Sequence, residues 1–326
     1  MNAPTPAAHA GARPRVLVTG AAGFIGRPCL PKLAALGYEV HAVSSRPRPD
    51  AGDGIHWHHV DLLAPDAVGE LCAAVRADQL LHLAWVTTPG AYARDPMNLE
   101  WTAASLHLIR RFAEHGGTRV VVAGTCFEYS HRTDERLHET VSELIPETLY
   151  GTCKVALHAV VARYADEVGL SSAWGRLFFL YGPREHPNRL VSSVILALLE
   201  DRDADCTIGT QVRDFLHVDD VAGAFVALLR SGVMGPVNVA SGQVTTVRDL
   251  VVEIGEQLDL PYRIRLGARP LPPSDPAQIV ADVTRLRDEV GFAPTFELRE
   301  GLADTIDWWR QRRDDPDDPD DRSTNP

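Results

Sequence analysis

The chain has 326 residues, 45% of them hydrophobic, so it can bury a large core in one or two domains. Its formal net charge of −12 argues against nonspecific binding of nucleic acid, which needs a surface rich in lysine and arginine. The five cysteines include no Cys-x-x-Cys pair, which favours a reducing compartment over a disulfide framework.

The two ends of the chain differ in composition from the rest. Residues 1–14 are rich in alanine and proline, and residues 314–326 repeat Asp-Asp-Pro, so we expect both segments to be disordered. The first segment lacks the charged start and apolar stretch of a signal peptide, and the chain has no run of about 18 apolar residues that could span a membrane. We therefore expect a cytoplasmic protein.

The first predicted strand, residues 15–19, leads into a glycine-rich turn. Gly20, Gly23 and Gly26 follow the strand with two residues between neighbours, and a helix is predicted over residues 24–36. Glycine permits a tight turn, lets backbone N–H groups approach a pyrophosphate, and allows a helix to pack closely on a strand. The order of strand, glycines and helix predicts a dinucleotide site.

The second predicted strand, residues 39–43, ends at Ser44-Ser45-Arg46. NAD-binding proteins of this design place an acidic residue here to accept from the ribose 2′-hydroxyl, whereas a nearby arginine suits a 2′-phosphate. Because the carboxylate is absent, we predict a preference for NADP(H), with NAD(H) as the alternative. The other interpretation is that Arg46 and Arg48 only solvate a loop.

Three histidines, His56, His58 and His59, raise the question of a metal site. Alternation along a strand places His56 and His58 on one face and His59 on the other, and no further cysteine or histidine cluster lies near in the sequence. We therefore predict a surface or edge strand and no metal site.

Two further apolar strands are predicted at residues 79–84 and 120–125. The second one ends in the hydroxyl of Thr125. Ligands of an open parallel sheet bind beyond the carboxyl ends of its strands. Thr125 is therefore expected at the same edge of the sheet as the glycine-rich turn. Helices are predicted over residues 98–115 and 150–168.

The helix at 150–168 begins with Tyr150-Gly151-Thr152-Cys153-Lys154. Positions i and i+4 share a helix face, so Tyr150 and Lys154 place a phenol beside an ammonium. A nearby cation lowers the pKa of tyrosine from its reference value of about 10, and a tyrosine so tuned can act as a general acid or base. The pair alone is a weak signal, and its position relative to Thr125 and the glycine-rich turn gives it weight.

The pattern changes beyond residue 172. We predict strands at 173–180 and 236–242, a polar loop at 184–189, and helices at 190–199, 221–229 and 250–258, with 304–310 in a last helix. Asp219 and Asp220 are predicted to cap the helix at 221–229, since carboxylates stabilise a helix N-terminus. No internal repeats are seen.

Together, Gly20/Gly23/Gly26, Thr125 and Tyr150/Lys154 resemble the extended short-chain dehydrogenase/reductase family, and within it the nucleotide-sugar epimerases, dehydratases and ketoreductases. The resemblance covers residues 15–310. It implies an α/β fold, a Rossmann-like doubly wound parallel sheet with a smaller C-terminal substrate-binding α/β domain. The implied dinucleotide-binding domain spans 15–172, with 213–240 returning to it, and the substrate domain spans 173–212 and 241–313.

The resemblance assigns three catalytic residues, Thr125, Tyr150 and Lys154. It assigns further residues to the cofactor, namely Gly20, Gly23, Phe24, Ile25, Gly26, Ser44, Ser45, Arg46, Asp61, Leu62, Leu83, Ala84, Trp85, Asn98, Tyr150 and Lys154. It assigns a third set to a nucleotide-sugar substrate, namely Thr87, Cys126, Phe127, Phe179, Arg189 and Arg213. Arg213 matches the arginine that clamps the nucleotide diphosphate, a task suited to the forked donors of guanidinium. A homodimer through helices 98–115 and 150–168 is also implied, with no nucleic-acid or membrane partner.

The implied chemistry is hydride transfer between a nicotinamide and a sugar carbon, with Tyr150 exchanging the proton. Dehydratases of the family carry an Asp-Glu pair directly after the catalytic hydroxyl, but Cys126 and Phe127 stand there, and Glu128 is expected to point elsewhere. An NADP(H)-dependent reductase acting on a keto group, at C4, of a nucleotide-linked deoxysugar is therefore the leading hypothesis. A nucleotide-sugar 4-epimerase with tightly bound NAD is the alternative, and a non-catalytic nucleotide sensor on the same fold is a third class. Phe179 and Pro272 stand where relatives often carry Asn and Arg, so the nucleotide and the sugar stay open.

Overall fold

A computed structural model describes residues 13–48, 54–132 and 135–314 of the chain. The two predicted disordered ends, apart from Arg13, Pro14 and Asp314, lie outside these residues. The centre of the fold is a seven-stranded sheet in the order β11-β6-β5-β4-β1-β2-β3, in which every neighbouring pair is parallel. Its strands are β1 (Arg15–Thr19), β2 (Glu39–Ser44), β3 (Ile55–His59), β4 (Gln79–His82), β5 (Arg119–Thr125), β6 (Ser171–Leu177) and β11 (Gly235–Val239).

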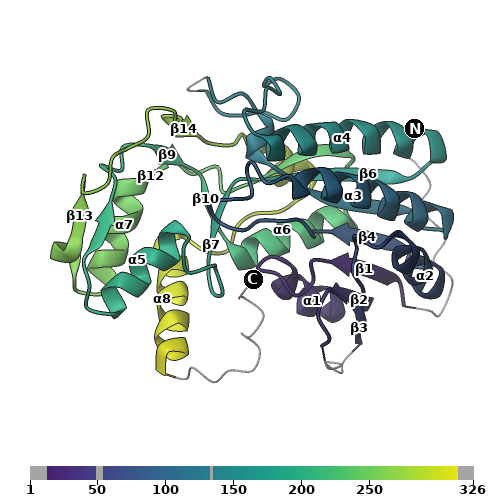
Figure 1. Cartoon of the computed structure of the whole chain (residues 1–326), viewed down its shortest axis with the longest axis horizontal. Helices are drawn as coiled ribbons and strands as arrows, with labels where there is room; N and C mark the ends of the chain where they lie inside the picture. Colours follow the sequence, from purple (N-terminus) through teal and green to yellow (C-terminus); the bar gives the residue numbers. More distant parts are fainter. Residues whose placement is uncertain (1–12, 49–53, 133–134, 315–326) are drawn as a thin grey trace.

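Helices cover both faces of this sheet, as a parallel sheet requires (Figure 1). On one face lie α1 (Gly26–Ala35) and α6 (Val218–Arg230), and on the other α2 (Pro65–Val75), α3 (Met97–Glu114) and α4 (Leu149–Val168). All seven residues of β5 are buried, which explains why its sequence is an unbroken apolar run rather than an alternating one. The prediction of a doubly wound α/β fold is confirmed.

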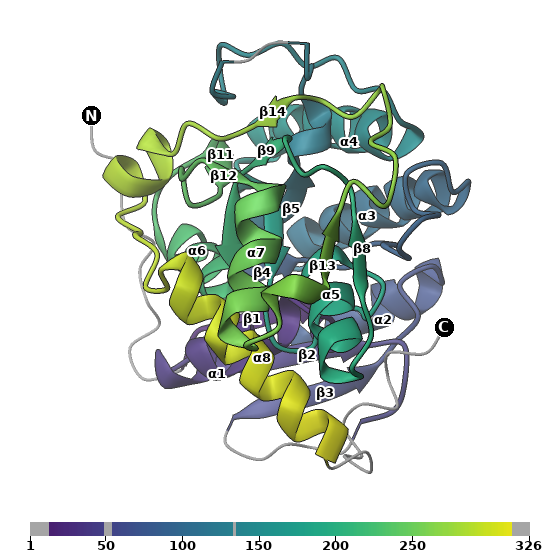
Figure 2. The same cartoon turned by 90° about the vertical axis from the view of Figure 1, so that its left-hand side faces the viewer.

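A smaller part of the molecule, at the left of Figure 1 and facing the viewer in Figure 2, packs around a separate apolar core. Its helices are α5 (Leu190–Leu199), α7 (Val247–Gln257) and α8 (Leu298–Asp314). Its short strands are β8 (Ala204–Cys206) with β13 (Ile264–Leu266), and β9 (Val212–Arg213) between β12 (Thr245–Thr246) and β14 (Gln278–Ile279). A two-stranded sheet of β7 (Phe179–Tyr181) and β10 (Phe215–His217) completes the strands, and single turns occur at η1 (Cys126–Glu128), η2 (Pro261–Arg263) and η3 (Arg285–Glu289).

The predicted strand at 173–180 is in fact two strands, β6 and β7. They separate at Phe178, whose N–H donates to the Val239 carbonyl oxygen at 3.2 Å, whereas the N–H of Phe179 donates to the Asp214 carbonyl oxygen at 3.1 Å. The chain thus changes partners within two residues and leaves the central sheet for β10. An apolar run does not show in the sequence where its hydrogen-bond partners change.

The prediction that Asp219 and Asp220 cap a helix at 221–229 was wrong. Helix α6 already begins at Val218, with His217 at the N-cap, so both aspartates lie in its first turn. Asp219 forms an ion pair with Lys32 of α1 at 2.7 Å, and Asp220 accepts from the backbone and side chain of Thr295 and from the N–H of Phe296. These carboxylates hold distant segments together, and the negative charge of each also stabilises the N-terminus of α6.

None of the helices in the part of the chain that the structure describes is long and apolar enough to cross a membrane.

Candidate active site

Thr125 and Tyr150 meet at the carboxyl end of β5. Thr125 is buried, and its Oγ1 accepts from the N–H of Phe127 at 3.3 Å. This bond caps the start of η1. Helix α4 starts one residue before Tyr150 and packs directly on η1. Gly151 permits this close approach, since a Cβ there would lie 2.3 Å from the Phe127 carbonyl oxygen. This contact places the Tyr150 phenol close enough to Thr125 for the threonine hydroxyl to influence its acidity.

Burial controls the acidity of Tyr150. The side chain is nearly inaccessible to solvent, and loss of solvation raises its pKa well above the usual value of a phenol, while the neighbouring Thr125 hydroxyl acts in the opposite direction. Tyr92, Glu128 and Cys126 raise the pKa further. Tyr150 is therefore neutral at pH 7 and carries a proton to donate.

Lys154 lies one helical turn from Tyr150 and is also buried. Its Nζ donates to the Ala123 carbonyl oxygen at 2.9 Å and lies 3.6 Å from the centre of the Trp85 ring, a cation–π contact. Burial lowers the pKa of Lys154 to about 7, and the carboxylate of Glu128 partly opposes this shift. The prediction that the ammonium of Lys154 lowers the pKa of Tyr150 below its usual value was wrong, because burial raises this pKa and the Nζ of Lys154 is directed toward β5 and Trp85.

Trp85 and Asn98 form the wall beside this pair. The indole N–H of Trp85 donates to Asn98 Oδ1 at 2.8 Å, and the buried amide of Asn98 donates to the carbonyl oxygens of Tyr92 and Asp95, both at 2.7 Å. Tyr92 in turn presents its ring edge-on to Tyr150, with 5.1 Å between centroids. Sequence reasoning missed Tyr92, because it lies in a segment without hydrophobic periodicity and is brought to the site by the contacts of that segment with Asn98 and with the N–H of Tyr150.

The glycine-rich turn has the shape that a dinucleotide needs. Gly20 adopts φ +66°, and a Cβ there would lie 2.8 Å from the Ala84 nitrogen, so the turn approaches the end of β4 closely. A Cβ at Gly26 would lie 2.2 Å from the Gly20 carbonyl oxygen, whereas one at Gly23 would meet only that oxygen, at 3.1 Å. No side chain caps the start of α1 at Ile25. Gly23 and the helix N-terminus thus leave room and backbone N–H donors for a pyrophosphate.

The remaining residues assigned to the cofactor also lie at the carboxyl edge of the sheet. Leu83 and Ala84 follow β4. Ser44 is the last residue of β2, and its Oγ accepts from the N–H of Arg46 at 3.1 Å. The carboxylate of Asp61 accepts from the N–H of Leu63 at 3.0 Å. Leu62 is buried, whereas Ser45, Arg46 and Asp61 are exposed, and Phe24 is partly exposed in the glycine-rich turn.

The residues assigned to the substrate form two groups. Arg189 lies over the Tyr92 ring at 5.3 Å and donates to the Thr87 carbonyl oxygen at 3.3 Å, which links the polar loop at 184–189 to the catalytic side of the sheet. Phe127 packs edge-on against Phe179, with 6.3 Å between ring centroids.

The guanidinium of Arg213 lies 5.4 Å from the Phe179 ring. Arg213 is buried, donates to the Pro276 carbonyl oxygen at 2.8 Å and forms an ion pair with Asp275 at 2.5 Å. The sequence did not reveal Asp275 as this partner, because the two residues lie 62 positions apart.

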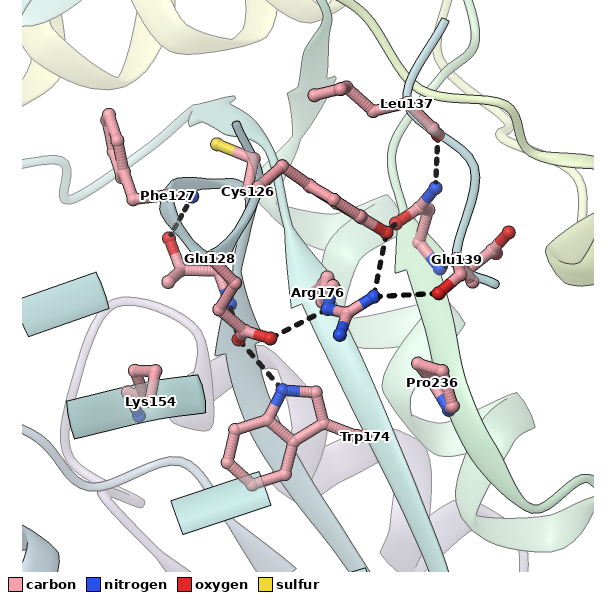
Figure 3. A network of polar contacts seen from close by, with 12 residues as sticks. Cys126, Phe127, Glu128, Leu137, Glu139, Lys154, Trp174, Arg176 and Pro236 are labelled. Carbon is pink, nitrogen blue, oxygen red and sulfur yellow. Dashed lines mark hydrogen bonds and ion pairs between the residues drawn. The ribbon is translucent and has the colours of Figure 1, made fainter. Parts of the chain in front are cut away.

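Cys126 and Glu128 are turned away from the reacting side chains. Burial raises the pKa of the Cys126 thiol to about 12, and the thiol packs with Tyr129 and Phe178 in a small apolar cluster, so it is no nucleophile. Glu128 is fully buried and accepts from Thr125, Trp174 and Arg176 (Figure 3). The expectation that Glu128 points elsewhere is confirmed.

His56 and His58 lie on one face of the edge strand β3, as predicted, and both rings lie beside that of His41, at 5.3 and 5.1 Å between centroids. Within residues 13–48, 54–132 and 135–314, no group of three or more His, Cys, Asp or Glu side chains is placed to hold a metal ion.

Comparison with known proteins identifies relatives of the same design. The sequence profile of the NAD dependent epimerase/dehydratase family matches residues 16–240. The chain is 28% identical to UDP-glucuronic acid decarboxylase 1 of Xenopus tropicalis over 311 residues, covering 92% of this chain and 73% of the relative. It is 27% identical to UDP-glucose 4-epimerase of Rhizobium leguminosarum bv. trifolii over 329 residues, covering 90% and 96%. Among solved structures, MoeE5 in complex with UDP-glucuronic acid and NAD is 30% identical, with a TM-score of 0.79 and coverage of 91% and 99%.

Proposed function

This chain belongs to the NAD dependent epimerase/dehydratase family and is an enzyme of the extended short-chain dehydrogenase/reductase type. We propose that it is an NADP(H)-dependent reductase acting on a nucleotide-linked keto-deoxysugar, with the keto group at C4. The observation that carries the proposal is the buried, protonated Tyr150 beside the buried Thr125, with Lys154 one turn away on α4. A neutral phenol at this edge of the sheet is suited to donate a proton to a ketone oxygen as that oxygen gains negative charge.

Each of the three residues has a distinct part in this chemistry. Tyr150 gives its proton to the ketone oxygen. Thr125, fixed at the end of β5, offers its hydroxyl to the same oxygen and stabilises the developing alkoxide. Lys154 as an ammonium would hold the nicotinamide ribose and would favour the tyrosinate that remains after proton transfer.

The residues that would hold the dinucleotide are those of the glycine-rich turn, the ends of β2 and β4, and Lys154. The narrow contacts at Gly20 and Gly26 and the open side of Gly23 fit its pyrophosphate. When bound, the reduced nicotinamide supplies the hydride, and the protein supplies position and the proton.

The end of β2 supports the choice of NADP(H). Ser44, Ser45 and Arg46 present hydroxyl and guanidinium donors where a carboxylate would favour NAD, and both Ser45 and Arg46 are exposed. The alternative, a nucleotide-sugar 4-epimerase that retains NAD, is favoured by a different observation: MoeE5, with 30% identity, was solved with NAD and UDP-glucuronic acid. An epimerase must oxidise and reduce the same carbon and therefore keeps its cofactor.

A dehydratase is disfavoured by the contacts of Glu128. Expelling a hydroxyl needs an acid and a base beside the sugar, and the two residues after Thr125 are a buried thiol and a phenyl ring. Glu128 is the nearest carboxylate along the chain, but both of its oxygens accept from buried donors in the core.

The substrate side follows from the two arginines. We propose that Arg213 clamps the nucleotide diphosphate and that Arg189, between Thr87 and Tyr92, reaches the sugar or the phosphate next to it. Asp275 and Pro276, which contact Arg213, belong to the segment 267–278, where we expect specificity for the nucleotide to lie. We also propose a homodimer through α3 and α4.

The experiment that tests this function begins with the cofactor. The purified protein is denatured, and any released dinucleotide is identified by chromatography. We expect little retained cofactor, tighter binding of NADPH than of NADH, and oxidation of NADPH when 4-keto-deoxysugar nucleotides are added. Near-stoichiometric NAD in the released fraction, together with interconversion of C4 epimers, would reject the reductase in favour of the epimerase.

A further inference from the structure

The N-terminus of α5 is capped by a residue outside the helix. The N-cap residue of a helix commonly accepts from a backbone N–H in the first turn, which needs a side-chain oxygen. The N-cap of α5 is Arg189, whose guanidinium has no acceptor atom and forms no such bond. Glu185, on the preceding loop, supplies the oxygen instead. Its Oε2 accepts from the N–H of Ser192 at 3.1 Å and from the Ser192 hydroxyl at 2.8 Å.

This cap is buried and connected to the C-terminal helix. Glu185 and Ser192 have exposed fractions of 6% and 0%. The Ser192 hydroxyl, which donates to Glu185, also accepts from the indole N–H of Trp309 on α8 at 3.2 Å. Helix α8 packs beside α5, and Trp309 belongs to the apolar core that both helices share (Figure 2). Water cannot readily replace a cap in this position, so its loss would leave the N–H of Ser192 buried and unpaired.

The start of the same loop is also fixed on α8. Arg184 adopts φ +72°, a left-handed conformation that costs energy for a residue with a Cβ. Its guanidinium lies 5.7 Å from the centre of the Trp308 ring, a cation–π contact. The N–H of Glu185 donates to the Gly182 carbonyl oxygen at 3.2 Å and closes the turn. The polar loop at 184–189 is therefore anchored on both α5 and α8.

Because Glu185 provides the cap, the side chain of Arg189 can reach the catalytic side of the sheet. Its guanidinium lies 5.3 Å from the centre of the Tyr92 ring and donates to the Thr87 carbonyl oxygen at 3.3 Å. The Tyr92 ring is in turn edge-on to that of Tyr150, at 5.1 Å. A serine or aspartate at the N-cap would turn its side chain back to the helix. Glu185 thus holds the first turn of α5 while Arg189 extends toward the reacting residues.

We propose that Glu185 is a positioning residue for the substrate: it caps α5 in place of Arg189 and thereby holds the Arg189 guanidinium where a nucleotide sugar binds. The proposal rests on the function proposed above in one respect, that Arg189 contacts this substrate. Burial raises the pKa of Glu185 to about 7, but the cap needs an acceptor oxygen rather than a charge, and a carboxyl group keeps acceptor capacity in both protonation states.

Hydrogen–deuterium exchange of the free protein tests the cap without any ligand. Glu185→Ala removes the acceptor, so the backbone of residues 184–193 should exchange about five- to tenfold faster, as expected for the loss of a helix cap. Glu185→Gln keeps an amide oxygen as acceptor and should stay within about twofold of the natural chain.

Two neighbouring serines give a matched pair of variants. Ser192→Ala removes the hydroxyl that joins Glu185 to Trp309 and should also speed the exchange of residues 184–193. Ser193→Ala is the control, because Ser193 is exposed and its hydroxyl donates to the Leu190 carbonyl oxygen within the same turn. We expect exchange in Ser193→Ala to match that of the natural chain.

A double-mutant cycle tests the effect on the substrate. The probes are UDP-glucose and dTDP-glucose, and the affinity of the one that binds more tightly is compared among the variants. Glu185→Ala and Arg189→Ala should each weaken binding by about five- to tenfold. Glu185→Ala added to Arg189→Ala should change the affinity by less than about twofold, because Glu185 acts through Arg189. A merely structural role would give the same loss in both backgrounds.

Unchanged exchange of residues 184–193 in folded Glu185→Ala would overturn the proposal, as would equal losses of affinity with and without Arg189. If Glu185→Ala does not fold, Ser192→Ala takes its place in both experiments, with the same expected directions. A natural chain that binds neither probe would reject the proposed function and with it the role toward substrate, and faster exchange in Glu185→Ala would then leave only the cap of α5 standing.

Discussion

Binding of NADPH is expected to draw a proton onto Lys154. In the free protein, burial lowers the pKa of Lys154 to about 7, so at pH 8 only about a tenth of the molecules carry the ammonium. The ribose hydroxyls of a bound cofactor would accept from the ammonium and its phosphates would attract it, so binding should raise this pKa. The bound state therefore holds more protons than the free state, and binding takes up a proton.

The size of the effect follows from the same pKa. If Lys154 is fully protonated in the complex, uptake at pH 8 is about 0.9 proton per site. Affinity then falls as pH rises above 7, by about fivefold between pH 7 and pH 8, which corresponds to about 1 kcal/mol. The 2′-phosphate, with a second pKa of about 6, is ionised throughout this range and adds little.

Isothermal titration calorimetry in buffers of different ionisation enthalpy measures the uptake directly. The slope of the observed enthalpy against the buffer enthalpy gives the number of protons exchanged at pH 8. Lys154→Met is the control and should show no uptake, with weaker binding. A slope near zero for the natural chain, or equal slopes for both proteins, would refute the assignment of Lys154 as the group that is charged on binding.

Three further outcomes are expected. Tyr150→Phe should lower the rate of keto-sugar reduction by about 10²- to 10⁴-fold, with little change in NADPH affinity, and a fully active variant would exclude Tyr150 as the general acid. Gly124→Ala should destabilise the fold by roughly 1–3 kcal/mol in urea unfolding, because its Cβ would lie 2.1 Å from Trp174 Nε1; a neutral effect would contradict the packing at the end of β5. Arg46→Ala should reduce the preference for NADPH over NADH in equilibrium binding by about tenfold, because it removes an exposed charged contact worth roughly 1–1.5 kcal/mol. An unchanged ratio of the two affinities would assign the selectivity to other residues.

Motifs and the family resemblance they carry were sufficient to predict the fold class, and local patterns predicted several elements, whereas the roles of the site residues stay predictions. The residues of α5 were predicted to their ends, and the helices that begin near Tyr150 and Asn98 within one residue, because an apolar periodicity and a start signal act over a few neighbouring positions. The glycine-rich turn could be predicted for the same reason, since its steric demands are local to Gly20, Gly23 and Gly26.

The tertiary structure decided the features that depend on distant partners and on loss of solvent. The i, i+4 spacing placed Tyr150 and Lys154 on one face, but the burial that lowers the pKa of Lys154 comes from β5 and Trp85. Glu128 and Arg176 lie 48 positions apart, and nothing in either local sequence indicates that they pair. Periodicity is a property of the backbone over a few residues, whereas a buried charge finds its partner and its pKa only when the whole chain has packed around it.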